Sequence, residues 1–240
     1  MKDTVKIERG KTRMIAHRGA GGVERENTLQ AFVASGNRTY YGQECDVHVT
    51  SDGKFLVYHD DNTGRLCNAD FIMEQTPFEK LRALKIKETD SEEFSDTLKM
   101  PAFEEYLTVA SRYEKVAVVE LKNRMSAEKI AEAIETCKKY YSLDKVIFIS
   151  FFFENLVDVR RLLPNQAVQF LIGEWQDDLP ARLSEHGFGL DIGYWSLTEE
   201  RVEALHAKGV LVNCWTCNEK KDAERLVRWG VDFITTDILE

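Results

Sequence analysis

The chain has 240 residues, of which 43% are hydrophobic and 30% are charged, and its formal net charge is −9. This composition is that of a globular protein and excludes a disordered or fibrous chain. The acidic balance argues against a nucleic-acid-binding protein and against a protein that binds anionic membranes. Neither a secretory signal nor the roughly 18 apolar residues of a membrane span is recognisable, so we expect no stable membrane insertion.

The first half of the sequence predicts four elements before residue 60. In chain order they are a strand at 13–17, a helix at 27–37, a strand at 42–50 and a hairpin arm at 54–59. Asn27 or Thr28 is a candidate cap for the helix, and Ser51-Asp52-Gly53 is a turn signal that folds the arm back. Residues 60–98 are polar and irregular, with one short helix near 78–84, and we interpret them as an insertion.

The second half alternates short β-branched or aromatic runs with longer amphipathic segments. Strands are expected at 116–121, 146–150, 167–172, 189–192, 210–215 and 233–235, and helices at 103–113, 127–141, 156–163, 179–185, 197–207 and 220–228. With the two earlier strands this makes eight, nearly all separated by helices, which predicts a parallel sheet. We therefore expect an α/β protein with a closed TIM (β/α)₈ barrel, formed by residues 1–240 as a single domain. An open doubly wound sheet is the alternative.

Three carboxylates are expected to converge at the carboxyl ends of the barrel strands. Glu44 and Asp46 alternate with apolar residues, so they share one face of their strand, and Glu120 holds an equivalent place on another strand. Like charges at close range resist joint ionisation, and a divalent cation removes that penalty. All-oxygen ligands favour Mg²⁺ or Ca²⁺.

Histidines and cations are expected at the same end of the barrel. His17 follows the first strand and His59 ends the hairpin arm, so the two can serve as acid and base near neutral pH. Arg18 and Lys122 are cationic donors for a phosphate. Taken singly, each of these residues is more often structural, but together they indicate metal-assisted cleavage of a phosphodiester.

At this point the sequence resembles the glycerophosphodiester phosphodiesterase family. The similarity extends over about residues 13–238, in family order, and the combination of motifs is specific. The motifs are Ile15-Ala16-His17-Arg18-Gly19, Glu26-Asn27-Thr28, Glu44-x-Asp46-Val47, Thr50-x-Asp52-Gly53, His59-Asp60, Met100-Pro101-x-Phe103-Glu104-Glu105, Glu120-Leu121-Lys122, Trp215-Thr216-x-Asn218, Gly230-Val231-Asp232 and Thr236-Asp237.

The resemblance implies a TIM barrel that hydrolyses small-molecule glycerophosphodiesters to sn-glycerol 3-phosphate and an alcohol. It implies one divalent cation, Mg²⁺ or Ca²⁺, held by three ligands, an acid–base pair and three substrate-binding residues. The metal ligands would be Glu44, Asp46 and Glu120, the acid–base pair His17 and His59, and the substrate-binding residues Arg18, Lys122 and Trp215. The sequence leaves two attacking groups open. Water could attack directly, or the glycerol 2-hydroxyl could attack and form a cyclic phosphate, as in related phospholipase C- or D-like barrels.

The chain departs from the family pattern before Glu26, where Arg25 replaces the usual proline. A proline would stiffen this loop, and Arg25 instead adds a charge near the mouth of the barrel. The stretch after Asp60 is also diverged, and since it would overhang the pocket, the departing alcohol is not predicted.

Two other functions remain as alternatives, a redox or zinc protein and a non-catalytic phosphodiester-binding barrel. Cys214-Trp215-Thr216-Cys217 is a C-x-x-C pattern, but no second pattern completes a four-cysteine site. Five cysteines, an odd number, do not predict a disulfide framework, so we expect a reduced, cytoplasmic protein. Phe151 and Trp195 follow strand ends; core packing is the preferred interpretation for Phe151, whereas Trp195 could also reach the mouth of the barrel.

Overall fold

The computed structural model describes residues 3–240 and contains nine strands and eight α-helices within that range. The strands are β1 (Arg13–Ala16), β2 (Gly42–Val49), β3 (Phe55–Val57), β4 (Val116–Leu121), β5 (Val146–Ser150), β6 (Val168–Ile172), β7 (Gly189–Gly193), β8 (Val212–Trp215) and β9 (Phe233–Thr236). The helices are α1 (Leu29–Gly36), α2 (Phe78–Arg82), α3 (Phe103–Arg112), α4 (Ala127–Tyr140), α5 (Phe153–Leu162), α6 (Leu179–His186), α7 (Glu199–His206) and α8 (Lys220–Trp229), with short 3₁₀ turns η1 (Met73–Gln75), η2 (Leu143–Lys145) and η3 (Tyr194–Ser196).

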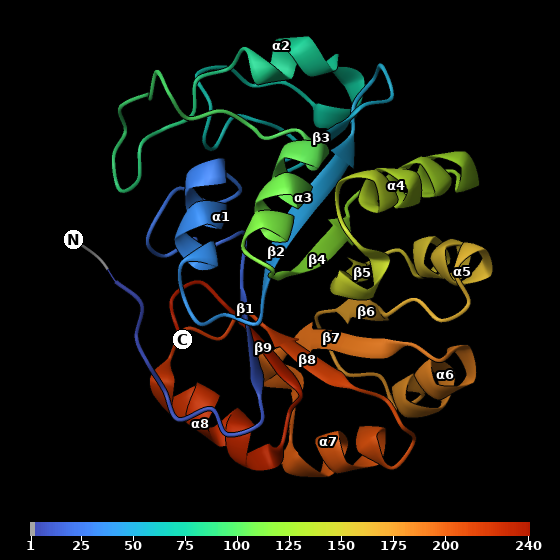
Figure 1. The fold of residues 1–240 in the computed structure, drawn as a ribbon. Helices are drawn as coiled ribbons and strands as arrows, with labels where there is room; N and C mark the ends of the chain where they lie inside the picture. Colours follow the sequence, from blue (N-terminus) through green and yellow to red (C-terminus); the bar gives the residue numbers. More distant parts are fainter. Residues whose placement is uncertain (1–2) are drawn as a thin grey trace.

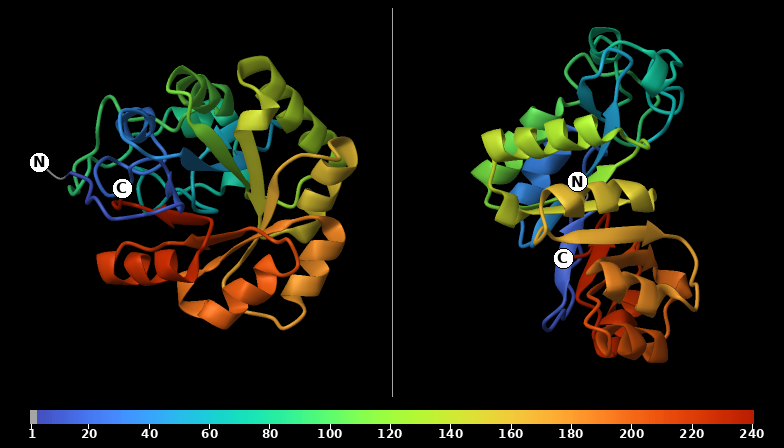
Figure 2. Two further views of the ribbon diagram at one scale, coloured as in Figure 1. Left: turned by 60° about the horizontal axis from the view of Figure 1, so that its bottom comes forward. Right: turned by 90° about the vertical axis from the view of Figure 1, so that its right-hand side faces the viewer.

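Eight of these strands close into a parallel barrel, which confirms the TIM-barrel prediction over the open sheet. The order around the barrel is β1-β2-β4-β5-β6-β7-β8-β9, and β9 pairs with β1 to close it. β3 lies outside this ring and pairs antiparallel with β2, as the expected hairpin arm. Figure 2 (left) shows the strands gathered at the centre with helices around them.

Alternation along the strands separates two apolar layers. Cys45 and Val47 of β2 belong to a buried cluster with Phe32 of α1 and Tyr106 of α3, between strands and helices. Residues one position away point into the barrel, where a smaller cluster includes Ile15, Val118, Ile149 and Leu171. The barrel interior is therefore filled by side chains, with this apolar cluster beside a hydrogen-bonded polar group formed by Gln169, Asn213 and Thr235.

The predicted insertion is present between β3 and α3. It lies at the top of Figure 1, with α2 as its longest helix. Its apolar residues, among them Leu66, Met73 and Leu81, form a separate buried cluster that is joined to the barrel by Leu56 and Met100. The segment therefore has a small core of its own and a fixed place beside the hairpin.

Most predicted elements are found within a residue or two of their expected bounds. Thr28, one of the two cap candidates, caps α1 through its side chain, and Thr198 caps α7 in the same way. The start expected for α5, Leu156, is wrong by three residues, because the helix begins at Phe153 without a side-chain cap that the sequence could reveal. None of the helices in residues 3–240 combines the length and apolarity that crossing a bilayer requires.

Candidate active site

The acidic cluster lies on two neighbouring strands. β2 and β4 pair in parallel, and their register places Asp46 beside Glu120. Glu44 is two residues earlier on β2 and points to the same face. One carboxylate oxygen from each of the three residues lies within 4.8 Å of the others, and all three side chains are buried. The three predicted ligands therefore form a group that could hold a metal ion.

Two cations flank the acidic cluster. Lys122 Nζ lies 3.0 Å from a Glu120 carboxylate oxygen and 3.4 Å from Asp46, and Arg18 Nε lies 3.5 Å from Asp46. Burial opposes ionisation of Asp46, but Lys122 and Arg18 outweigh it and lower the pKa of this carboxyl. Burial and the Asp46 charge raise the pKa of Glu44 and the pKa of Glu120.

One carboxylate oxygen of the cluster has no protein partner. Glu44 Oε2 accepts a hydrogen bond of 2.8 Å from the backbone N–H of Arg18, whereas the buried Oε1 has no hydrogen-bond partner within residues 3–240. Buried polar atoms are nearly always paired. An unpaired oxygen among three carboxylates fits a hard divalent cation, which prefers oxygen ligands.

The loop after β1 brings Arg18 to the cluster through an unusual backbone. Arg18 and Gly19 have positive φ angles of 53° and 75°, and a Cβ atom at Gly19 would lie 2.6 Å from the carbonyl carbon of Ala31. Only glycine fits this approach. Asn27, which also has a positive φ, donates from Nδ2 to Asp46 Oδ2 over 2.7 Å. Arg18 of the first motif and Asn27 of the second thus both contact Asp46, one of the candidate metal ligands.

Each of the two predicted acid–base histidines is held by a carboxylate. His17 Nδ1 lies 2.7 Å from Asp237 Oδ1, and His59 Nδ1 lies 2.6 Å from Asp60 Oδ1. With Nδ1 engaged, Nε2 is the ring nitrogen left for proton transfer. Burial lowers the pKa of His59, and the Asp46 and Asp60 carboxylates offset only part of this effect. Asp60 and Asp237 stand in recognised motifs, but no motif predicts that they pair with these histidines.

An arginine from the insertion joins the two sides of the mouth. Arg65 donates to Asp60 at 2.6 and 3.1 Å and to Glu26 at 2.7 and 3.0 Å. Glu26 in turn accepts from Arg18 at 2.7 Å. Arg65 therefore connects the carboxylate behind His59 with the carboxylate that holds Arg18. Arg65 lies in the diverged segment, so no motif in the sequence marks it as a site residue.

The pocket enclosed by these groups has a volume of about 140 Å³. It is lined by His17, Arg18, Glu44, His59, Glu120, Ile149, Phe151, Leu171, Asp191, Trp215, Thr216 and Thr235. Six of the eight predicted site residues are among these, and Asp46 and Lys122 contact Arg18 and Glu120 directly behind the lining. The structure thus brings all eight together.

Aromatic side chains form one side of the mouth. Trp215 packs edge-on against Phe151 and Trp195, with ring centroids 5.8 and 5.5 Å apart. Phe151 is 47% exposed and lines the pocket, so its preferred assignment to the core is wrong. Trp195 is 54% exposed and reaches the mouth through Trp215. The peptide bond between Trp215 and Thr216 is cis.

Arg25 has a structural role in the place of the usual proline. Its guanidinium donates to the backbone carbonyls of Lys87 and Glu88 in the insertion, with an Nε–O distance of 2.8 Å to Lys87. The loop before Glu26 is therefore tied to the insertion by hydrogen bonds instead of being stiffened by a ring.

The structure gives no support to redox or zinc use of the C-x-x-C pattern. Cys214 and Cys217 are both buried and unpaired, and their sulfurs lie near the backbone carbonyls of Phe233 and Glu219. Burial raises the pKa of Cys214, and it raises that of Cys217 to about 11. Such thiols are unreactive, since the thiolate is the nucleophile and metal ligand.

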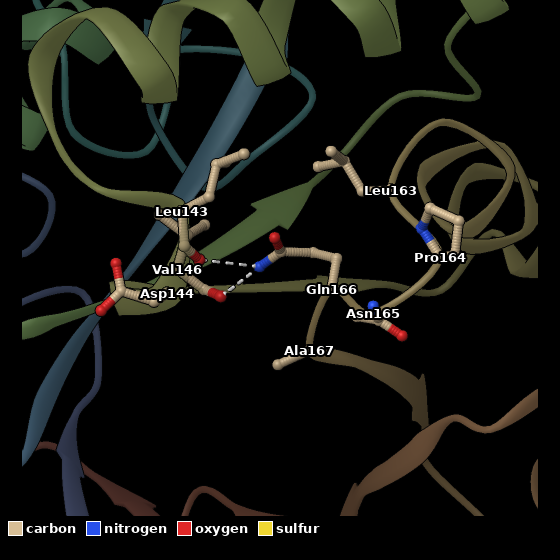
Figure 3. A pocket seen from close by; sticks show the side chains of 8 residues that line it. All are labelled: Leu143, Asp144, Val146, Leu163, Pro164, Asn165, Gln166 and Ala167. Atoms are coloured by element: carbon tan, nitrogen blue, oxygen red, sulfur yellow. Dashed lines mark hydrogen bonds between the residues drawn. The ribbon is translucent and has the colours of Figure 1, made fainter.

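A second cavity, of about 390 Å³, lies at the opposite end of the barrel, where β5 and β6 begin. Figure 3 shows its lining, in which Asp144 is the one charged residue. The Gln166 side chain spans it, with its amide nitrogen 3.1 Å from the Leu143 carbonyl and 2.5 Å from that of Val146. This cavity carries none of the groups needed for catalysis.

Comparison with known proteins agrees with the geometry of the site. The model of the glycerophosphoryl diester phosphodiesterase family matches residues 17–240. The glycerophosphodiester phosphodiesterase of Caldanaerobacter subterraneus subsp. tengcongensis is 29% identical over 237 residues, which cover 95% of this chain and 94% of the relative.

Solved structures give the same result. An Oleispira antarctica phosphodiesterase in complex with the product sn-glycerol-3-phosphate superposes with a TM-score of 0.86 at 27% identity, covering 94% of this chain and 92% of that one. A glycerophosphodiester phosphodiesterase from Parabacteroides distasonis has a TM-score of 0.78 at 29% identity, with coverages of 96% and 94%. The chain therefore belongs to the glycerophosphoryl diester phosphodiesterase family and is an enzyme of that class.

Proposed function

We propose that this chain hydrolyses glycerophosphodiesters to sn-glycerol 3-phosphate and an alcohol, with His17 and His59 as the acid–base pair. The observation that carries the proposal is that both histidines, each held at Nδ1 by a carboxylate, line one pocket with the acidic cluster. The sn-glycerol-3-phosphate bound to the related Oleispira enzyme supports the substrate class.

Glu44, Asp46 and Glu120 would hold one divalent cation, Mg²⁺ or Ca²⁺. Their close spacing and the unpaired Glu44 oxygen support this assignment, and carboxylate oxygens suit either ion. A cation bound there supplies positive charge to the phosphoryl oxygens as a Lewis acid.

Arg18 and Lys122 would bind the phosphodiester beside this cluster. The planar guanidinium of Arg18 can donate to two phosphoryl oxygens, whereas Lys122 provides a compact charge. Both are less than a fifth exposed, so their charges are weakly screened by solvent. His17 and His59 line the same pocket as Arg18, so a phosphodiester bound there would lie within reach of both histidines.

The two histidines would then divide the proton transfers. Nε2 of one takes the proton from the attacking oxygen as the new P–O bond forms, and Nε2 of the other gives a proton to the alcohol oxygen as the old P–O bond breaks. Asp237 and Asp60 fix the ring orientations and stabilise each imidazole when it is protonated. Trp215 would line the path of the substrate.

A cytoplasmic location and a role in glycerol and lipid metabolism belong to the same proposal. All five cysteines are unpaired and buried, which suits a reducing compartment.

The test is release of sn-glycerol 3-phosphate from several glycerophosphodiesters, measured with Mg²⁺ or Ca²⁺ and with EDTA. We expect release with either or both cations and its loss in EDTA. No release from any substrate would refute the activity, and unchanged release in EDTA would refute the metal requirement alone. Phosphorus NMR of the products adds a further outcome, since accumulation of a cyclic phosphate would assign the chain to the cyclising barrel phosphodiesterases.

A further inference from the structure

Asp191, in the middle of β7, is a buried carboxyl that the proposed chemistry leaves unused. Its neighbours Leu190 and Ile192 belong to the cluster between strands and helices, so Asp191 points into the barrel, where it lines the pocket. The residue is 1% exposed, and Oδ1 has no hydrogen-bond partner in the part of the chain that the structure describes. A buried, unpaired carboxylate oxygen is unfavourable and calls for an explanation.

Neither strand neighbour of Asp191 donates to its Oδ1, which is unpaired within residues 3–240. Leu171, its register neighbour on β6, is apolar. Asn213, its register neighbour on β8, directs its side chain to other partners, since its amide nitrogen donates one hydrogen bond to Gln169 at 3.1 Å and its oxygen accepts from Thr235 at 3.1 Å. The Asp191 carboxyl is therefore available to form a hydrogen bond with a ligand in the pocket.

Asp191 faces the acidic cluster from the other side of the barrel. β7 is four strands from β2 in a ring of eight, and so lies opposite Glu44 and Asp46. It is not among the carboxylates whose oxygens lie within 4.8 Å of one another. A substrate whose phosphate lies at the cluster would extend across the pocket to reach Asp191.

We propose that Asp191 binds the terminal hydroxyl of the glycerol moiety, the one farther from the phosphate, and so selects glycerol esters among phosphodiesters. The inference rests on the proposed function. The carboxyl beside the apolar side chains of Ile149 and Leu171 suits a polyol, which presents hydroxyls and C–H groups together. The variable alcohol would then point to the open mouth, toward the exposed Phe151 and Trp195.

The experiment compares glycerophosphocholine with its deoxy analogue, which lacks only that terminal hydroxyl. Wild-type kcat/KM should favour glycerophosphocholine by about 10- to 100-fold, as for one hydrogen bond to a buried carboxyl. In Asp191→Ala this preference should fall to about threefold or less, through loss of activity on glycerophosphocholine. Asp191→Asn keeps an acceptor in the same place and should retain most of the preference.

Three controls distinguish a role of Asp191 in substrate binding from a role in the stability of the fold or in cation binding. Glu203→Ala removes an exposed carboxyl of α7, outside the pocket lining, and should leave the preference unchanged. The Tm of metal-free Asp191→Ala should be equal to or above that of the wild type, because an unpaired buried carboxyl is removed, and its affinity for Mg²⁺ or Ca²⁺ by calorimetry should be unchanged.

The outcomes are distinguishable. The inference is overturned if the wild type shows a preference near one, or if the preference is undiminished in Asp191→Ala. It is also overturned if Asp191→Ala loses activity equally on both substrates or loses its affinity for the cation. If the alanine variant does not fold, a wild-type preference near one still overturns the inference. A wild type that cleaves neither substrate with metal supplied would refute the proposed function itself.

Discussion

Nδ1 of His17 lies 2.7 Å from Oδ1 of Asp237, so the residue after the first barrel strand is held by the residue after the last. The pairing exists only because β1 and β9 are hydrogen-bonded neighbours. Closure of the barrel therefore orients one of the two proposed acid–base groups.

Asp237→Asn should lower kcat by about 100-fold or more, because the amide no longer stabilises the protonated imidazole and favours the wrong tautomer. Steady-state kinetics at saturating substrate measures this. His206 and Asp232 form a similar pair, with 2.9 Å between Nε2 and Oδ2, away from the pocket. His206→Gln should leave kcat unchanged, and an equal loss in the two variants would contradict a specific role for Asp237.

Divalent cations should stabilise the fold by relieving repulsion in the acidic cluster. At about a hundred times its Kd, a cation adds about 2.7 kcal/mol to the free energy of unfolding, or roughly 5–10 °C in Tm for a chain of this length. Glu44→Gln should remove most of this shift, whereas Glu128→Gln, on the exposed first turn of α4, should not. A cation-induced shift that survives in Glu44→Gln would place the ion elsewhere.

The metal-free protein should become less stable as the pH rises from about 5 to about 8. The pKa of Glu120 is raised from 4.5 to about 8 by burial and by Asp46, so its contribution to stability is complete below about 4.5 and is lost as the pH passes the folded-state pKa. Calorimetric Tm values across this range test it, and Glu120→Gln should flatten the decline. If the Tm of the metal-free wild type rises over this pH range while that of Glu120→Gln does not, the assigned direction of the Glu120 pKa shift is contradicted.

His59 should titrate below the ordinary histidine pKa of 6.5, because burial disfavours its charged form. NMR of the imidazole ring in the metal-free protein measures this directly. Asp60→Asn should lower the midpoint further, since the Asp60 carboxylate favours the protonated ring. A midpoint at or above 6.5, or one that rises in Asp60→Asn, would be inconsistent with the burial described.

Arg65→Met should reduce kcat by about tenfold, because Asp60 and Glu26 lose their shared partner and the orientations of His59 and Arg18 loosen. Cation affinity should stay unchanged. Lys85→Met, which breaks an exposed ion pair with Asp96 in the same insertion, is the matched control and should have little effect. If both variants behave alike, Arg65 has no positioning role.

The sequence predicted the barrel and its ligands because both depend on local patterns. Alternation along β2 fixes Glu44 and Asp46 on one face, and turn residues fix the return of the hairpin to His59. Asp237 pairs with His17 only because the ends of β1 and β9 meet in space, which no local pattern specifies. Asp60 directly follows His59, and adjacency in the sequence alone does not show that the two side chains turn toward each other.

The remaining site residues were missed for similar physical reasons. Asp191 is one polar residue in an apolar strand, and its significance comes from the pocket that it faces. Phe151 directly follows the apolar strand β5, so its sequence context resembles that of a core residue. In the fold this position lies at the barrel mouth, where the side chain is exposed. The start of α5 at Phe153 carries no capping side chain to mark it.

The most direct test of the account is the rate of sn-glycerol 3-phosphate release by wild type, His17→Gln and His59→Gln at saturating divalent cation. Calorimetry on the same preparations should show that each variant still binds the cation. We predict that the wild type releases product and that each variant loses about 100-fold or more of its kcat. Near wild-type turnover in either variant, with cation bound, would contradict the assignment of that histidine as acid or base.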